Sequence, residues 1–317
     1  MGPRGFDSAA VIGLGTMGAG IALLLAEHGL EVHVADTSDG LTRQLVAGAL
    51  ARRERTGSGV PDVSIRVAAD PEDAARGREL VIEAIPEVLE AKLALLARIS
   101  AVAPGAVVAT NTSSLSIDVL ARGVSAPERF LGVHFFNPAD LVPGVEVIRS
   151  QLTDPSIVDR LVEFLVALGK VPSVVRSSPG FIANRLQLAL FLEALRCVDE
   201  GLASASTIDS VVRSTFGFRL PAFGPLAVAD LAGLDVYQSI LEELHRGLGE
   251  RFAVPDGLRR FVAAGRLGLK SGGGIYDYDQ PVEETIAARD RAYRSIAKAM
   301  GSIPTGHEGA APNAESR

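Results

Sequence analysis

The amino-acid sequence predicts an α/β fold, with a doubly wound parallel sheet followed by a smaller, all-helical domain. Apolar runs of strand length alternate with helical segments over residues 11–175, which is the pattern of a parallel sheet with crossover helices. From Phe181 to about Arg266 the pattern is almost wholly helical. Hydrophobic residues make up 47% of the 317 residues, while aromatic residues make up only 5% and Trp is absent. Such a core of Ala, Val, Leu and Ile suits buried parallel strands.

The expected elements follow one another at regular intervals. Strands are predicted at 11–12, 32–35, 64–67, 80–85, 107–111, 131–136, 145–148 and 171–175. Helices are predicted at 19–28, 41–55, 87–102 and 156–168. The segment Ser177-Ser178-Pro179-Gly180, rich in residues typical of turns, then links the alternating strand–helix region to the helical region. We therefore expect a sheet domain over residues 1–177, a helical domain over 178–300 and a disordered tail over 301–317, which is rich in Gly, Pro, Ser and Asn.

The first strand is followed by a glycine-rich turn whose residues predict a dinucleotide site. The turn comprises Gly13, Leu14, Gly15, Thr16, Met17 and Gly18, and a helical stretch and a second apolar run ending in Asp36 come next. In a Rossmann-type domain the first glycine permits the tight turn, the second lets a pyrophosphate approach, and the third allows helix–strand packing. Asp36 is placed to hydrogen-bond the ribose hydroxyls of NAD and to repel the 2′-phosphate of NADP. We therefore predict NAD as the cofactor.

Composition excludes several other classes of partner. The formal net charge of −7 argues against nucleic acid, which needs clustered Lys and Arg. A single cysteine excludes an internal disulfide and fits a reducing compartment, so a cytoplasmic location is expected. The longest apolar stretches are too short to span a membrane, and no metal-ligand spacing is visible.

Four polar residues stand out against apolar strands and turns: Ser113, His134, Glu146 and Asn184. Ser113 follows a strand at the sheet edge where doubly wound folds bind ligands. Glu146 lies between two valines, and a buried carboxylate needs a partner, for which His134 is the obvious candidate. Each residue also has a purely structural interpretation: Ser113 as a helix cap, His134 as a satisfied core histidine, Glu146 as a partner of any arginine, and Asn184 as a helix-start residue.

Six segments resemble the 3-hydroxyacyl-CoA dehydrogenase family in order and spacing. They read GLGTMGAGIA, VIEAIPE, NTSSLSI, HFFNP…VEVI, SPGFIANRL and LKSGGGIYDY, and the resemblance covers residues 9 to about 279. The resemblance implies that His134 is the general base, that Glu146 orients it, and that Ser113 and Asn184 contact an L-3-hydroxyacyl thioester. It further implies that Glu87, Lys92, Ser113, Asn137 and Lys270 touch NAD, and that the chain forms a homodimer through its C-terminal domain, with 223–237 as the candidate surface.

Two stretches depart from the family pattern. Residues 139–144 include Val142-Pro143, which is more like relatives that oxidise free hydroxy acids, such as gulonate and carnitine dehydrogenases and lambda-crystallin. Residues 41–64 are shorter than in typical members, with Arg52 and Gly59 where a CoA-contacting Ser and Lys are expected. Arg52, Arg53 and Arg55 either bind a phosphate or form a solvated helix face.

Three functions therefore remain open on the sequence. The first is an NAD-dependent dehydrogenase of L-3-hydroxyacyl thioesters carried by CoA or by an acyl carrier protein. The second is an NAD-dependent dehydrogenase of a free 3-hydroxy acid. The third is a non-catalytic NAD-binding structural protein that keeps the same fold.

Overall fold

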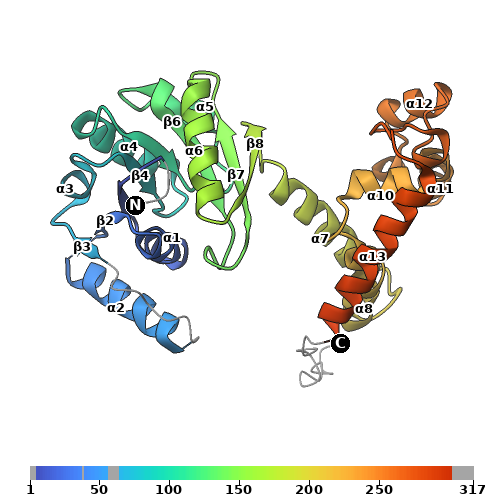
Figure 1. Cartoon of the computed structure of the whole chain (residues 1–317), viewed down its shortest axis with the longest axis horizontal. Helices are drawn as coiled ribbons and strands as arrows, with labels where there is room; N and C mark the ends of the chain where they lie inside the picture. Colours follow the sequence, from blue (N-terminus) through green and yellow to red (C-terminus); the bar gives the residue numbers. More distant parts are fainter. Residues whose placement is uncertain (1–4, 38, 56–63, 302–317) are drawn as a thin grey trace. The chain divides into compact units, whose positions relative to one another are not determined.

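The computed structural model describes residues 5–37, 39–55 and 64–301 (Figure 1). The sequence expectations for Gly59 and for the tail from residue 302 onward lie outside these ranges. The side chains of Arg52, Arg53 and Arg55 are also outside the description, so the phosphate-binding alternative stays a prediction.

The described strands of the first part of the chain form one eight-stranded sheet in the order β3-β2-β1-β4-β5-β6-β7-β8. The strands are β1 (Ser8–Ile12), β2 (Glu31–Ala35), β3 (Ile65–Val67), β4 (Leu80–Glu83), β5 (Val107–Thr110), β6 (Phe130–Phe135), β7 (Gly144–Arg149) and β8 (Val171–Arg176). The first six strands pair in parallel, as the alternating pattern predicts. The crossing from β1 to β4 beside β2 creates the switch point at which such sheets bind ligands.

Helices cover both faces of the sheet. They are α1 (Thr16–Glu27), α2 (Asp39–Arg55), α3 (Pro71–Ala75), α4 (Leu89–Val102), α5 (Ile117–Ala121) and α6 (Pro155–Ala167), with a 3-10 turn at Pro127–Arg129. One buried cluster joins α1 and α6 to the face that carries Val11 and Val133. A second joins α3, α4 and α5 to the face that carries Ile12 and Phe130. Alternation along each strand therefore fills two cores, which confirms the predicted fold class.

One strand pairing differs from the wholly parallel sheet that we expected. Strand β7 runs antiparallel to β6, and β8 then pairs with β7 in parallel. The connection between β6 and β7 is too short for a crossover helix, so β7 must turn back along its neighbour. As a result of this antiparallel pairing, His134 on β6 lies directly opposite Glu146 on β7.

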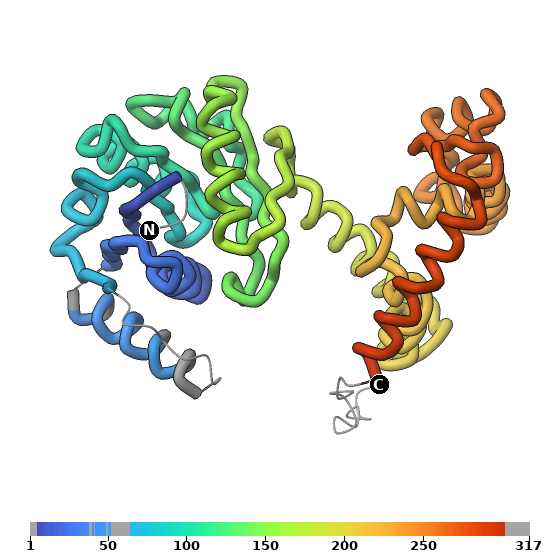
Figure 2. Tube along the Cα trace, in the orientation of Figure 1, coloured from blue at the N-terminus to red at the C-terminus, as the bar shows by residue number. Residues whose placement is uncertain are grey.

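The second part of the chain is helical. Its elements are α7 (Ala183–Asp199), α8 (Ala205–Ser214), α9 (Phe216–Arg219), α10 (Pro225–Ala232), α11 (Leu234–Leu248), α12 (Asp256–Ala263) and α13 (Val282–Met300), with 3-10 turns at Glu250–Phe252 and Leu269–Ser271. Figure 2 traces the long closing helix α13, which packs through Tyr293 against Phe218 and Phe223 with ring centres 5.7 and 6.0 Å apart. The chain divides into two compact units inside α7, between Phe191 and Leu192. The domain boundary near Ser177 stays a prediction.

Candidate active site

The glycine-rich turn joins β1 to α1 with very close backbone packing. Gly13 has φ +89°, and a Cβ there would lie 2.7 Å from the backbone of Ala84. A Cβ on Gly18 would lie 1.8 Å from the carbonyl oxygen of Gly13, so only glycine fits. At Gly15, by contrast, nothing lies within 4 Å of the Cβ position. This open space at the N-terminus of α1 is suited to an anion such as a pyrophosphate.

Asp36 follows β2 and reaches back to the same turn. Its Oδ2 accepts a hydrogen bond from the backbone N–H of Leu14 at 2.5 Å, and its Oδ1 accepts from the N–H of Thr37 at 2.7 Å. The carboxylate is therefore held at the pocket wall by two donors. A negative charge fixed here suits the ribose hydroxyls of NAD, and the residues present fit that cofactor.

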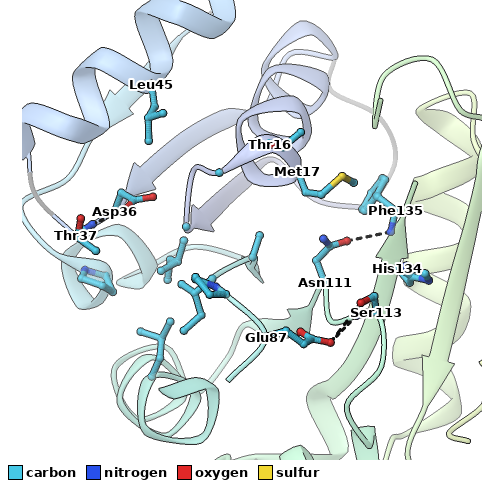
Figure 3. Close-up of a pocket in the computed structure, with 18 of the residues that line it drawn as sticks. Thr16, Met17, Asp36, Thr37, Leu45, Glu87, Asn111, Ser113, His134 and Phe135 are labelled. Carbon is cyan, nitrogen blue, oxygen red and sulfur yellow. Dashed lines mark hydrogen bonds between the residues drawn. The ribbon is translucent and has the colours of Figure 1, made fainter. Parts of the chain in front are cut away.

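A pocket of about 1080 Å³ lies along the carboxyl ends of the strands. Figure 3 shows Asp36 and Thr37 at one end and Ser113, His134 and Phe135 at the other. Its polar and charged lining residues are Thr16, Asp36, Thr37, Glu87, Arg98, Asn111, Ser113, His134 and Asn137. The structure thus brings most of the predicted cofactor residues of the first unit and two of the predicted catalytic residues, Ser113 and His134, to one cavity.

His134 and Glu146 form a buried hydrogen-bonded pair. Nδ1 of His134 lies 2.9 Å from Oε2 of Glu146, and each side chain is only 7% exposed. A carboxylate can only accept a hydrogen bond, so Nδ1 of His134 carries the proton and donates the hydrogen bond to Glu146. Nε2 is then left as a hydrogen-bond acceptor. The rings of Phe136 and Phe181 flank the imidazole, with centres 4.5 and 5.8 Å away, and fix its orientation.

The other oxygen of Glu146 holds the start of α7. Oε1 accepts from the backbone N–H groups of Ile182 at 2.9 Å and Ala183 at 3.0 Å, so the carboxylate also satisfies the helix N-terminus. The next residue, Asn184, donates from Nδ2 to the carbonyl oxygen of Ser113 at 2.8 Å. Ser113, His134, Glu146 and Asn184 are therefore one connected group, although Asn184 does not line the pocket.

Glu87 organises the turn that carries Ser113. Its Oε1 accepts from the N–H of Ser113 at 3.0 Å, from the N–H and Oγ of Ser114, both at 2.9 Å, and from Oγ1 of Thr112. Burial alone would raise the pKa of Glu87, but the hydrogen bonds from Thr112 and Ser114 and the charge of Lys92 outweigh it and hold the pKa below its usual value. Glu87 is therefore ionised at neutral pH.

Lys92 lies behind the pocket wall rather than in it. Its side chain is 1% exposed, and Nζ donates to Oε1 of Glu83 at 2.6 Å and to the carbonyl oxygen of Ile85 at 3.0 Å. Oε2 of Glu87 is 3.6 Å away. Lys92 is not among the described residues that line the pocket, so its predicted contact with NAD stays a prediction.

Lys270 lies in the second unit, where its Nζ donates to Oδ2 of Asp235 at 2.7 Å. The LKSGGGIYDY segment folds around buried Asp230, which accepts from the N–H groups of Ile275 and Tyr276 and from the hydroxyl of Tyr278. The structure therefore explains most of this segment by its own packing. The expected contact of Lys270 with NAD remains a prediction.

Asn111 and Phe136 are among the pocket residues that were not singled out from the sequence. Asn111 accepts through Oδ1 from the N–H of Phe135 at 3.0 Å and so ties the end of β5 to β6 beside His134. Phe136 stacks near His134, as described above. Asn111 ends a predicted strand two residues before Ser113, and that position was the available signal.

The described residues contain no group of three or more His, Cys, Asp or Glu side chains that could hold a metal ion. Over the same residues, no helix has the length and apolar character needed to cross a membrane.

Two family models match successive parts of the chain. The 3-hydroxyacyl-CoA dehydrogenase NAD binding domain matches residues 8–178, and the 3-hydroxyacyl-CoA dehydrogenase C-terminal domain matches residues 180–278. Together they span nearly all of the sequence outside its two ends.

Individual relatives of known name cover almost the whole chain. A 5-formyl-3-hydroxy-2-methylpyridine 4-carboxylate 5-dehydrogenase from Mesorhizobium japonicum is 33% identical over 91% of this chain and 96% of its own length. A probable 3-hydroxybutyryl-CoA dehydrogenase from Bacillus subtilis is 37% identical over 85% of this chain and 96% of its own. The crystal structure of a 3-hydroxyacyl-CoA dehydrogenase from Archaeoglobus fulgidus superposes with a TM-score of 0.75 at 30% identity, covering 92% of this chain and 99% of that one.

Proposed function

The chain belongs to the 3-hydroxyacyl-CoA dehydrogenase family, and from this premise we propose that it interconverts an L-3-hydroxyacyl thioester and the 3-ketoacyl thioester. It is an NAD-dependent oxidoreductase. The observation that carries the specific reaction is the His134–Glu146 pair, buried at one end of a pocket whose other end holds Asp36. Bound NAD supplies the hydride acceptor at C4 of its nicotinamide ring.

His134 is the general base of the proposed reaction. As the alcohol becomes a ketone, the proton of the 3-hydroxyl must leave, and Nε2 of His134 is free of Glu146 to accept it. Glu146 keeps the imidazole in this tautomer and stabilises the imidazolium that forms. The burial of both side chains excludes water and strengthens their interaction.

Ser113 and Asn184 position the substrate in this proposal. The Ser113 hydroxyl donates to the oxygen at C3, and the Asn184 amide donates to the thioester carbonyl. The bond from Asn184 to the Ser113 carbonyl supports this assignment, because it holds the two donors in one group. Glu87 supports it further by fixing the backbone of the Ser113 turn through two N–H groups.

The acyl group's carrier separates two candidate substrates. CoA or an acyl carrier protein is the candidate that follows from the family and from the name of the Bacillus subtilis relative. A free acid is favoured by two observations: the Mesorhizobium japonicum relative is named for a pyridine carboxylate, and this chain carries Val142-Pro143 after β6. Lys170, which is buried, donates to the carbonyl oxygens of Ala139 at 2.6 Å and Val142 at 3.0 Å and so holds this segment in place.

Steady-state rates on a matched set of substrates test the proposal. Acetoacetyl-CoA, the same acyl group on a carrier protein and on pantetheine, and free 3-hydroxy acids are offered with NADH or NAD. We expect turnover of acetoacetyl-CoA and better activity on a carrier-protein or pantetheine thioester. Inert thioesters together with turnover of a free 3-hydroxy acid would replace the thioester function with the second candidate.

We also propose that the chain forms a homodimer through its helical part. Several large apolar side chains there are exposed, among them Leu192, Leu195, Leu226, Val236 and Ile240. Exposed apolar residues in such number are typical of protein–protein contact surfaces. Leu226 and Val236 lie within residues 223–237, the dimer surface that the family resemblance implies.

A further inference from the structure

Glu87 presents an ionised carboxylate to the pocket, and its two oxygens face different surroundings. All of its hydrogen bonds from the serine turn reach Oε1, whereas Oε2 lies on the side of Lys92, 3.6 Å from Nζ. The side chain is 33% exposed and lines the cavity, close to Ser113 in Figure 3. Its charge therefore acts on whatever occupies the Ser113 end of the pocket.

The surrounding charges do not cancel that of Glu87. Lys92 is 2.6 Å from the fully buried Glu83 and only 3.6 Å from Glu87, so two carboxylates share one ammonium group. Arg98 is the only Lys or Arg among the described residues that line the pocket, and its Nε pairs with Glu72 at 2.6 Å. The Glu83–Lys92–Glu87 group therefore leaves a net negative charge at the cavity wall.

We propose that Glu87 makes this site discriminate between the two redox states of its cofactor, favouring NAD⁺ over NADH. The nicotinamide ring carries a positive charge in NAD⁺ and none in NADH, while the rest of the cofactor is the same. The inference rests on the proposed function: hydride transfer requires C4 of the nicotinamide ring to lie beside C3 of the substrate, whose oxygen contacts Ser113 and His134. Oε1 of Glu87 is within 3.5 Å of Oγ of Ser113, so a ring at that position lies close to the carboxylate.

The physical effect of such a charge is large enough to measure. In a partly exposed site, two opposite charges several ångströms apart attract each other appreciably, because the effective dielectric constant is well below that of water. The attraction exists only for the oxidised cofactor. Glu87 thereby shifts the equilibrium on the enzyme toward NAD⁺, without contributing to proton transfer.

Glu87→Gln removes the negative charge of Glu87 while keeping the shape of its side chain. Because every hydrogen bond from Thr112, Ser113 and Ser114 reaches the same oxygen, the amide oxygen of Gln can keep all of them. Dissociation constants for NAD⁺ and NADH are measured by calorimetry on the full chain without acyl substrate. We expect the Kd of NAD⁺ to rise about tenfold, equivalent to about 1.4 kcal/mol, while the Kd of NADH changes less than about twofold.

Glu90→Gln is the matched control, since Glu90 is exposed near the start of α4 and is not among the described pocket residues. It removes the same charge and should leave the ratio of the two constants unchanged. Glu87→Asp, which keeps the charge, should retain most of the preference for NAD⁺. An equal rise of both constants in Glu87→Gln, or an unchanged ratio, overturns the inference. These binding measurements need no turnover, so a chain inert on every thioester would defeat the proposed function while the ratio still decides this inference.

Discussion

Single side chains at this site each hold two parts of the structure. One oxygen of Glu146 pairs with His134 and the other satisfies two N–H groups at the start of α7. Asp36 likewise bonds Leu14 with one oxygen and Thr37 with the other. Such residues are pre-organised before any ligand arrives, because their own partners fix their rotamers.

Replacing the proposed base should affect the chemical step alone. His134→Gln removes the group that accepts the hydroxyl proton, so we expect kcat to fall by about 10²–10⁴-fold. The Kd of NADH, measured by fluorescence, should barely change, because a neutral amide side chain of similar size replaces a neutral imidazole. Near-normal turnover of the variant would require another base and would contradict the assigned role.

Asp36 should set the choice between NAD and NADP. Asp36→Ala removes the acceptor for the ribose hydroxyls and the repulsion of a 2′-phosphate, so affinity for NAD should fall more than affinity for NADP. Kd values for both cofactors measure the effect. Asp36→Asn, which keeps an oxygen acceptor but loses the charge, should weaken NAD less than Asp36→Ala. Equal turnover with both cofactors in the unaltered chain would show that Asp36 does not discriminate.

At the scale of elements, the sequence predicts those features of the fold that depend on the pattern of neighbouring residues. Alternating strands and helices, the glycine turn and Asp36 all lie in local sequence, and the fold class, the family and NAD are confirmed. The antiparallel β6–β7 pairing was missed, because apolar runs do not encode strand direction. The hydrogen bond between His134 and Glu146 was nevertheless expected, since a buried carboxylate needs a partner.

The sequence pattern could not predict contacts between residues that are far apart in the chain. The family resemblance implies that Lys92 contacts NAD, which stays a prediction, but no local pattern indicates that its side chain is buried against Glu83. Asn111 bonds the backbone of Phe135, which is 24 residues away in sequence. Neither contact leaves a periodic or compositional signal, because each depends on how non-adjacent strands and helices meet.

The hydrogen bond from Tyr278 to Asp230 should make the stability of the chain depend on pH in the alkaline range. Burial, and then the charge of Asp230, raise the pKa of Tyr278 from 10.0 to about 12. Since the folded pKa lies above the unfolded value, this phenol contributes stability that is fully present below pH 10 and is lost as the pH rises toward 12. Absorbance titration should show one of the four tyrosines ionising near pH 12.

Tyr278→Phe is the matched variant for that titration. Its absorbance titration should lack the tyrosine that ionises near pH 12. Its free energy of unfolding in urea should fall less between pH 9 and pH 11 than that of the unaltered chain. At pH 8 it should be less stable by about 1.5–3 kcal/mol, the usual contribution of a hydrogen bond to a charged group. A titration identical to that of the unaltered chain would contradict the assignment to Tyr278.

At the scale of the whole molecule, the two units bury their apolar residues very differently. The sheet unit encloses two large clusters of fully buried side chains. In α8 and α13, which lie wholly in the second unit, no described residue is buried. A helical unit that leaves so much apolar surface exposed gains stability when a second surface covers it.

The proposed homodimer makes the final prediction. Light scattering of the full chain should give twice its mass of 33.1 kDa. Leu226→Glu and Val236→Glu place charges on exposed apolar positions, 53% and 44% accessible, within the predicted surface, and should dissociate the dimer because a charge buried at an interface without a partner is costly. Val166→Glu, at a 57% exposed position on α6 of the sheet unit, should leave the mass unchanged. A monomeric unaltered chain, or equal masses in all three variants, would contradict this surface.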